Sequence, residues 1–405
     1  MNRRQFGGTM LAMGARRLLA GTSGGIDDVL RKGRESRGIP AVTAIVANPD
    51  RVLYSSAFGK RDGMAGRDVT PDSLFRIASM TKAITTTAAM QMVEQGKVTL
   101  DEPVSKYLPT LGTLQVLDGF DSADKPILRA QKKDIALKHL LTHTSGCVYP
   151  TWDAALRKYV TANPPPATDF LAYPQRFDAG ARWEYGTGID WAGRLVEKLS
   201  GLTLEDYFQR NILQPLAMKD TSFICPPEKF DRLVNLARRQ SDGSYKQDTR
   251  TQPAVPKAFS GGGGLYSSVT DYVRFTQMIL RKGRGPGGQQ ILKAKTVELM
   301  MANQIGSLAV EELKSTDPAT SADANMHPGA IDKYTFGFLL NPTAYPGGRS
   351  AGSLAWAGID NTFYWIDPQR KLTAVIMMQF LPFVDKTAIA MLGDFEKAVY
   401  ATFAK

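Results

Sequence analysis

The stretch FRIASMTK, residues 75–82, is followed by a long run of helix-forming residues that ends near Gly96. A helix that begins near Ala78 puts Ser79 in its first turn, with Lys82 three residues on and on the same face. A serine hydroxyl needs a proton acceptor within hydrogen-bond reach before it attacks a carbonyl carbon. A buried lysine can be that acceptor, because burial lowers its pKa. The stretch therefore predicts a nucleophile beside its base, at a helix start whose N–H groups favour an oxyanion.

The same stretch also allows a plainer interpretation, in which Ser79 caps a helix and Lys82 is a solvated side chain. Serine, any two residues and lysine recur by chance in many proteins. The apolar spacing from residue 78 to residue 95, with Ile84 and Met92 at core positions, indicates a buried helix. Burial of that helix would take the lysine out of water, which the catalytic interpretation requires.

The composition is that of a soluble globular protein. The chain has 405 residues, of which 43% are hydrophobic and 22% charged, so we expect two lobes or one large domain with an insertion. The formal net charge is +11, but the basic residues are spread along the chain without a basic helix or zinc-finger spacing, which argues against a nucleic-acid partner. After the first residues no apolar run approaches the roughly 18 residues that cross a membrane, so we expect no stable membrane insertion.

The few metal-ligating side chains argue against a metal or another cofactor. Cys147 and Cys225 are the only cysteines, and His139, His143 and His327 are the only histidines. None of them forms a CxxC or HExxH motif. We therefore expect no disulfide framework, no metal and no cofactor.

The first 24 residues differ from the rest of the chain. MNRRQF, residues 1–6, resembles a twin-arginine export signal, and a short apolar stretch follows over residues 7–15. Arg16 and Arg17 interrupt that stretch, and no good Ala-x-Ala cleavage site follows. We interpret residues 1–24 as an export-signal-like or disordered leader. The protein is then cytoplasmic or, if the leader functions, periplasmic or exported.

Strand-like segments lie at both ends of the chain and helical segments between them. A helix is predicted over residues 26–37, strands over 41–47, 52–58, 334–340, 354–356, 361–367 and 372–379, and a last helix over 386–403. This order predicts an α/β (α+β) fold, in which one antiparallel sheet is built from both ends and flanked by helices. We assign residues 25–75 and 256–405 to the sheet domain and 76–255 to an inserted, mostly helical domain, with the active site between them.

Four consecutive glycines, residues 261–264, mark a place where backbone must approach closely. Glycine runs also hold phosphates, but here no Lys-Ser or Lys-Thr pair follows, and the strand-loop-helix unit is missing. A nucleotide site is therefore not expected.

Six short motifs follow one another along the chain. They are the S-x-x-K of residues 79–82, LLTHTSG at 140–146, WEY at 183–185, PLAMKDT at 215–221, GGGL at 262–265 and WAG at 356–358. From residue 26 onward the sequence resembles the serine β-lactamase and penicillin-binding-protein superfamily. Within it, the sequence is most similar to the class C β-lactamase-like esterases called family VIII carboxylesterases.

The resemblance implies a role for each site residue. Ser79 would be the acyl-accepting nucleophile, Lys82 its base, and Tyr185 the residue that passes a proton to the leaving group. Gly358 would let substrate approach the strand edge, and the N–H of Ile359 would join that of Ser79 as the second oxyanion donor. Without the resemblance, a half-buried core tyrosine is the simpler interpretation of Tyr185.

Two departures from the lactamase pattern bear on substrate. The asparagine two places after the tyrosine is Thr187 here, and the Lys-Thr pair that grips a carboxylate is Trp356-Ala357. Loss of that cation removes a charge-assisted anchor, and Trp356 offers an apolar wall, although it could equally be a sheet-packing aromatic. The departures favour uncharged esters. We expect further pocket walls at Tyr149, Trp152 and Phe336.

The resulting hypothesis is a serine carboxylesterase acting on a small-molecule ester. Alternatives are an acyltransferase to a bulky alcohol, a D-amino peptidase or weak β-lactamase, and a silent binding protein on the same fold. His143 and Ser145 also look like a catalytic pair, but we expect a buried histidine that holds a turn. The acyl length, the natural substrate and the oligomeric state stay open.

Overall fold

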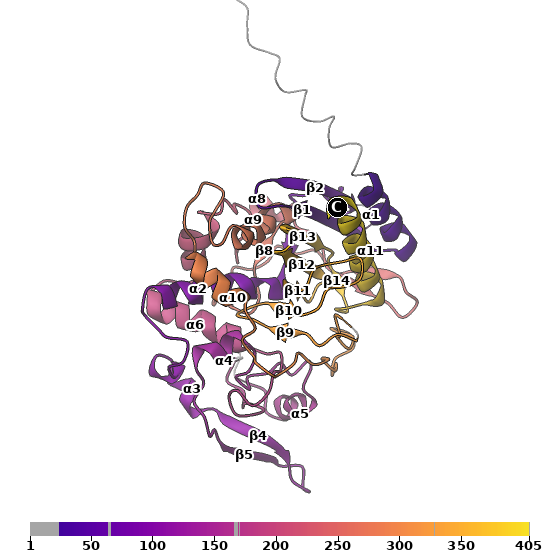
Figure 1. Cartoon of the computed structure of the whole chain (residues 1–405). Helices are drawn as coiled ribbons and strands as arrows, with labels where there is room; N and C mark the ends of the chain where they lie inside the picture. Colours follow the sequence, from indigo (N-terminus) through magenta and orange to yellow (C-terminus); the bar gives the residue numbers. More distant parts are fainter. Residues whose placement is uncertain (1–23, 64–65, 166–168, 170, 328, 405) are drawn as a thin grey trace, which may run out of the picture.

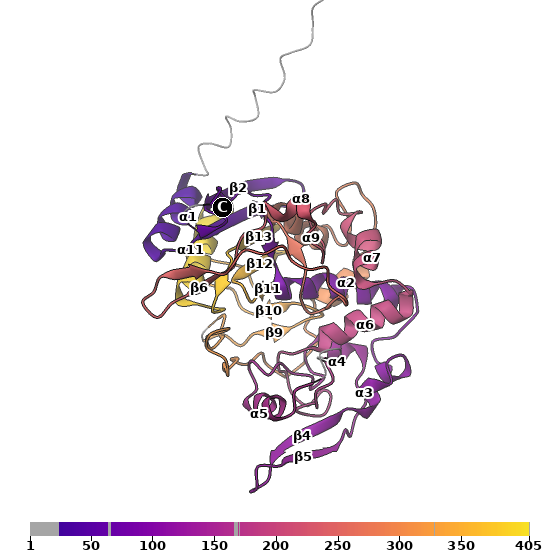
Figure 2. The same cartoon turned by 180° about the vertical axis from the view of Figure 1, so that it is seen from behind.

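The computed structural model describes residues 24–63, 66–165, 169, 171–327 and 329–404. The predicted leader lies outside these residues except for Gly24, which begins the first helix, α1 (Gly24–Arg37). Within the described residues, no helix is both long and apolar enough to cross a membrane. Figures 1 and 2 show the molecule from two opposite sides.

One antiparallel sheet of seven strands combines both ends of the chain. Its order is β2-β1-β13-β12-β11-β10-β9. The strands are β1 (Ala41–Ala47), β2 (Val52–Gly59), β9 (Lys333–Tyr334), β10 (Leu339–Asn341), β11 (Ser353–Gly358), β12 (Thr362–Asp367) and β13 (Leu372–Met377). The amino-terminal β1 pairs with the carboxy-terminal β13, with Ile45 opposite Val375. The predicted fold class is confirmed; the domain boundaries stay a prediction.

The two faces of the sheet pack against different helices. Ala374 and Ile376 of β13 face a core shared with α1 and the last helix, α11 (Lys386–Phe403). Val375 and Met377 alternate to the other face, where α9 (Val269–Leu280) packs. This alternation is the two-residue period of a strand buried on both sides. In Figure 1, α1 and α11 lie side by side at the end of the sheet that carries β1 and β2.

The middle of the chain is mostly helical. Its longer helices are α2 (Thr81–Glu94), α4 (Leu137–Leu141), α5 (Ala154–Ala162), α6 (Gly188–Ser200) and α7 (Leu204–Phe208), and α7 continues as a π-helix, Gln209–Leu213. Helix α2 is buried along nearly its whole length and packs on α6. Gly201 ends α6 in the left-handed conformation, at φ 71°.

Short elements complete the fold. They are β3 (Phe75–Arg76), the 3-10 turns Ala78–Met80 and Val104–Lys106, α3 (Thr110–Thr113), α8 (Pro227–Phe230), β6 (Ala237–Arg239), β7 (Tyr245–Gln247), β8 (Tyr266–Ser267), α10 (Ala294–Met301) and β14 (Phe380–Leu381). The ladder between β3 and β8 holds the segment before Ser79 against the segment after the glycine run.

Two local expectations are corrected. The segment 334–340 is not one strand, because Gly337, at φ 85°, turns the chain between β9 and β10, which pair antiparallel. Within the region expected to be helical and loop-like, β4 (Gln115–Phe120) and β5 (Pro126–Ala130) form a hairpin. It projects from the molecule at the end opposite α1, as both views show.

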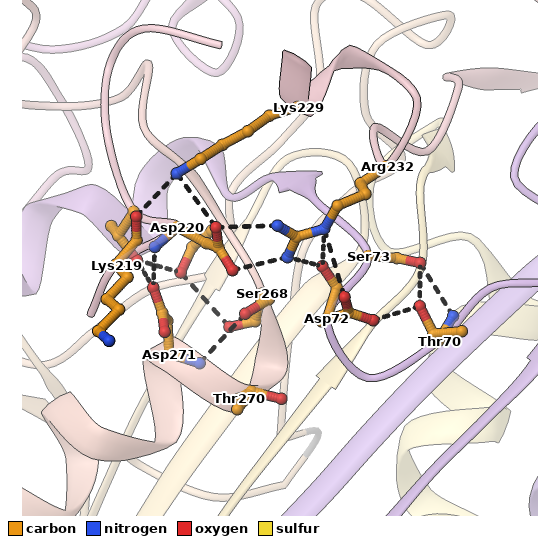
Figure 3. Close-up of polar contacts among 12 residues, drawn as sticks. Thr70, Asp72, Ser73, Lys219, Asp220, Lys229, Arg232, Ser268, Thr270 and Asp271 are labelled. Carbon is orange, nitrogen blue, oxygen red and sulfur yellow. Dashed lines mark hydrogen bonds and ion pairs between the residues drawn. The ribbon is translucent and has the colours of Figure 1, made fainter. Parts of the chain in front are cut away.

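The PLAMKDT motif has a structural explanation (Figure 3). The Asp220 carboxylate binds the guanidinium of Arg232 at 2.6 and 2.9 Å and the ammonium of Lys229 at 3.1 Å. The N–H of Asp220 donates to Asp271 at the start of α9, and Arg232 also donates to the carbonyl of Asp72. The Arg232 guanidinium lowers the pKa of Asp220, so the carboxylate stays charged. This cluster ties the motif to the loop that leads into β3 and the Ser79 turn.

Candidate active site

Ser79 lies in a 3-10 turn, Ala78–Met80, directly before α2. The N–H of Ile77 donates to the carbonyl of Leu265 at 3.0 Å, which fixes the turn against the glycine run. Ala78 adopts φ 43°, a left-handed conformation that costs a non-glycine residue about 1–2 kcal/mol. The predicted helix start is therefore a strained turn that sets Ser79 ahead of α2.

Lys82 is fully buried, and its Nζ makes three hydrogen bonds. It donates to Ser79 Oγ at 3.2 Å, to Tyr149 OH at 3.0 Å and to the carbonyl oxygen of Gly262 at 2.6 Å. Three acceptors match the three N–H bonds of an ammonium group. The structure thus brings Ser79 and Lys82 into contact, as their spacing predicts.

Tyr149 and Asp190 belong to the same network, and the sequence interpretation missed both contributions. The Tyr149 hydroxyl donates to Asp190 Oδ2 at 3.1 Å, and the N–H of Gly262 donates to Asp190 Oδ1 at 2.9 Å. Burial, then the Asp190 charge, raises the pKa of Tyr149 well above its ordinary value, so its hydroxyl stays protonated. Asp190 is in the first turn of α6. No local pattern links these positions, because Tyr149 is 67 residues from Lys82.

Tyr185 lies beside this network but does not share its hydrogen bonds. Its ring centroid is 5.0 Å from Lys82 Nζ and 5.1 Å from the ring of Tyr149. Within the described part of the chain, no group hydrogen-bonds to the Tyr185 hydroxyl. Thr187, at the position of the lactamase asparagine, is buried at the start of α6, and Lys82 bonds to Tyr149 rather than to it.

The WAG motif runs along β11, next to the Ser79 turn. A Cβ on Gly358 would lie 2.3 Å from the carbonyl oxygen of Ile77, so only glycine allows this approach. The ring of Trp356 lies 5.0 Å from that of Tyr185. Trp356 and Ile359 both line the cavity that contains Ser79.

Two cavities meet at Ser79, which is the one described residue that lines both of them. One, the aromatic cavity, has walls that include Trp152, Trp183, Tyr185 and Trp356. The other is lined by the glycine run together with Arg76, Ala78, Leu265, Tyr266 and Asp360. Of the expected wall residues, Trp152 lines the aromatic cavity. The expectation for Phe336 is wrong, because this side chain is buried in the core. Tyr149 contacts Lys82 instead.

His143 is buried and holds a turn. Its Nδ1 accepts a hydrogen bond from the N–H of Gly186 at 3.3 Å, and its carbonyl oxygen accepts one from the N–H of Glu184. Burial, then the charge of Lys82, lowers the pKa of His143 well below its ordinary value, so the ring is neutral. Ser145 accepts a bond from the N–H of Cys147 instead of pairing with this histidine.

The ligand types that would hold a metal do not cluster in the part of the chain that the structure describes. There, no group of three or more His, Cys, Asp or Glu side chains is arranged to bind an ion. The residues around Ser79 instead provide a nucleophilic hydroxyl, a lysine amino group, two phenols and a buried carboxyl group.

Comparison with known proteins places this site in a family. The chain is 32% identical over 412 residues to the monacolin J acid methylbutanoyltransferase of Aspergillus terreus, covering 93% of this chain and 95% of the relative. It is 30% identical over 388 residues to the lovastatin esterase of Penicillium rubens, covering 87% and 92%. The solved structure of unliganded simvastatin synthase (LovD) from Aspergillus terreus matches with a TM-score of 0.82 at 30% identity, covering 94% of this chain and 98% of that one.

The family assignment follows from a match over most of the chain. The family model described as Beta-lactamase covers residues 26–393. That range includes the Ser79 turn, the mostly helical middle of the chain and strand β11. The chain therefore belongs to the beta-lactamase family, with acyl-transferring and ester-hydrolysing enzymes among its relatives.

Proposed function

We propose that this protein is a serine carboxylesterase that hydrolyses uncharged carboxylic esters through an acyl-enzyme on Ser79. The observation that carries the proposal is the contact between Ser79 Oγ and the buried Lys82 Nζ, at 3.2 Å, where two cavities meet. A nucleophile at such a junction can accept the two arms of an ester, one in each cavity.

Each step uses a group already in place. The neutral form of Lys82 takes the hydroxyl proton as Ser79 Oγ bonds to the carbonyl carbon. The N–H groups of Ser79 and Ile359 stabilise the oxyanion. The C–O bond to the alcohol then breaks, and the leaving oxygen takes the proton of the Tyr185 hydroxyl, which regains one from the Lys82 ammonium, so that the lysine is neutral again. Water then attacks the acyl carbon while Lys82 takes its proton. The bond from the acyl carbon to Ser79 Oγ breaks as Lys82 returns the proton to Oγ, which releases the acid and restores the serine hydroxyl.

The two tyrosines suit different tasks. Tyr149 OH accepts from Lys82 and donates to Asp190, so its hydrogen bonds are already used. Tyr185 OH has no partner among the described residues and belongs to a side chain that lines the aromatic cavity. Tyr185 is therefore the better donor to the leaving alcohol.

The walls near Ser79 support an uncharged substrate. Trp356 occupies the position of the lactamase lysine and packs in an aromatic group with Tyr185 and Tyr334. A substrate carboxylate would find no cation at this position and would lose its hydration there. This disfavours the D-amino peptidase and β-lactamase alternatives, which hydrolysis of a chromogenic cephalosporin tests directly.

Acyl transfer to a bulky alcohol is the second candidate. The aromatic cavity can hold an alcohol in place of water. The acyltransferase name of the Aspergillus relative favours the same reaction. Hydrolysis and transfer share every step up to the acyl-enzyme, so they differ only in the second acceptor.

The test is turnover of p-nitrophenyl acetate, butyrate and octanoate by the wild type and by Ser79→Ala, with and without added alcohols. The proposal predicts p-nitrophenol and free acid from the wild type and none above background from the variant. If the product with bulky alcohols is mainly a new ester, the second candidate replaces the first. Turnover retained by Ser79→Ala would refute both.

A further inference from the structure

Two of the three groups that Lys82 contacts are themselves held by one buried carboxylate. Besides Ser79 Oγ, the Lys82 ammonium donates to Tyr149 OH and to the Gly262 carbonyl. Asp190 Oδ2 accepts from that tyrosine hydroxyl at 3.1 Å, and Oδ1 accepts from the N–H of Gly262 at 2.9 Å. Asp190 is thus connected to Lys82 through two residues, Tyr149 and Gly262.

The surroundings of Asp190 are built for this arrangement. The residue is only 2% exposed, and Ser260 Oγ is a further hydrogen-bond donor to its Oδ1. A Cβ on Gly262 would lie 2.1 Å from Asp190 Oδ2, so the glycine run has to be glycine here because the carboxylate occupies that space. A buried charge with three donors has its hydrogen-bonding capacity largely satisfied. The predicted close backbone approach at the glycine run is therefore an approach to α6.

We propose that Asp190 is a positioning residue, which fixes Tyr149 OH and the Gly262 carbonyl so that the remaining N–H of Lys82 points at Ser79 Oγ. The inference rests on the proposed function, because it assigns a task to Asp190 only if Ser79 and Lys82 carry out the reaction.

The test is the dependence of Ser79 acylation on ester concentration in Asp190→Asn and Tyr149→Phe. Stopped-flow release of p-nitrophenol from p-nitrophenyl butyrate is followed at its isosbestic wavelength, and the burst amplitude counts active sites. Asp190→Asn should lower the maximal acylation rate on the order of 100-fold, the effect of misplacing a catalytic group by about 1 Å. The ester concentration that gives half of the maximal rate should stay close to that of the wild type, because Asp190 lines neither of the two cavities.

Tyr149→Phe removes the connection from Asp190 to Lys82 through Tyr149 OH and keeps the connection through Gly262. We expect a smaller loss of the maximal acylation rate, roughly tenfold. The control is Glu197→Gln, which makes the same carboxylate-to-amide change on α6 but at a side chain that accepts from the N–H of Leu204. It should acylate at the wild-type rate.

The outcomes separate the two claims. If the wild type forms no acyl-enzyme on Ser79, the proposed function fails. If the wild type is acylated, and Asp190→Asn keeps its maximal acylation rate per active site, only the positioning role is overturned. A variant that loses burst amplitude but reacts normally per remaining site would likewise show a purely structural role. If Asp190→Asn does not fold, Tyr149→Phe decides: a rate equal to that of the wild type refutes the inference.

Discussion

Gly358→Ala tests how closely strand β11 must approach the nucleophile. The added Cβ would lie 2.3 Å from the Ile77 carbonyl oxygen and 2.3 Å from Thr362 Oγ1, whereas ordinary contacts begin at 3.4 Å. The Ile77 atom is backbone in the turn that carries Ser79, so the strand and the turn must separate by roughly 1 Å. Such overpacking costs about 1–3 kcal/mol of the free energy of unfolding. A shift of that size at the site lowers kcat/KM on the order of 100-fold.

The assay for Gly358→Ala combines kcat/KM on p-nitrophenyl butyrate with a urea unfolding curve. The matched control is Gly393→Ala on α11, where a Cβ meets no atom within 4 Å. Alanine there should keep activity and raise the free energy of unfolding slightly, because it favours a helix more than glycine does. If Gly358→Ala keeps kcat/KM within about threefold of the wild type and unfolds at the same urea concentration, the described approach of β11 is wrong.

Three further predictions concern charge. Glu396→Ala leaves the buried Arg349 unpaired, so urea unfolding should show a free energy of unfolding lowered by about 3–5 kcal/mol. The control, Glu298→Ala in a surface ion pair, should lower it by less than about 1 kcal/mol. Equal losses in the two variants would contradict the stabilising role of the buried pair. Burial and neighbouring lysines lower the pKa of His139 to about 4, so the folded state should lose stability as the pH falls from 6.5 toward that value. The His139→Gln variant should lose less stability than the wild type over this pH interval. If the urea midpoints of the variant and the wild type fall equally with pH, the role of His139 is contradicted. Trp356→Lys should raise the ratio of cephalosporin hydrolysis to ester hydrolysis roughly tenfold, because the lysine can bind the cephalosporin carboxylate. An unchanged ratio would show that Trp356 does not determine the preference for uncharged substrates.

Short sequence patterns predict the parts of the structure that depend on contacts between residues close together in the chain. The i, i+3 spacing is enough to place Lys82 beside Ser79, and alternation together with turn residues is enough to predict β1, β2 and β13. The turn at Gly337 was missed, because residues 334–340 are apolar enough to look like one strand, and the left-handed glycine becomes visible only in the structure.

The rest of the site depends on contacts between distant segments. Tyr149 reaches Lys82 from a loop, and Asp190 reaches both tyrosine and glycine from α6. No spacing in the sequence predicts these contacts, because they arise from the packing of α2, α6 and the glycine run. The hairpin β4–β5 was overlooked for another reason: its pairing register shifts between Leu117 and Gly119, which breaks the alternation of a strand.

The central claim is a covalent acyl-enzyme on Ser79. The most direct measurement is mass spectrometry of the wild type and of Ser79→Ala, quenched in acid during turnover of p-nitrophenyl butyrate and then mapped by peptide. The account predicts a butyryl adduct on the peptide that contains Ser79 in the wild type, and no adduct in the variant. An adduct on another residue, or turnover by the variant at the wild-type rate, would contradict it.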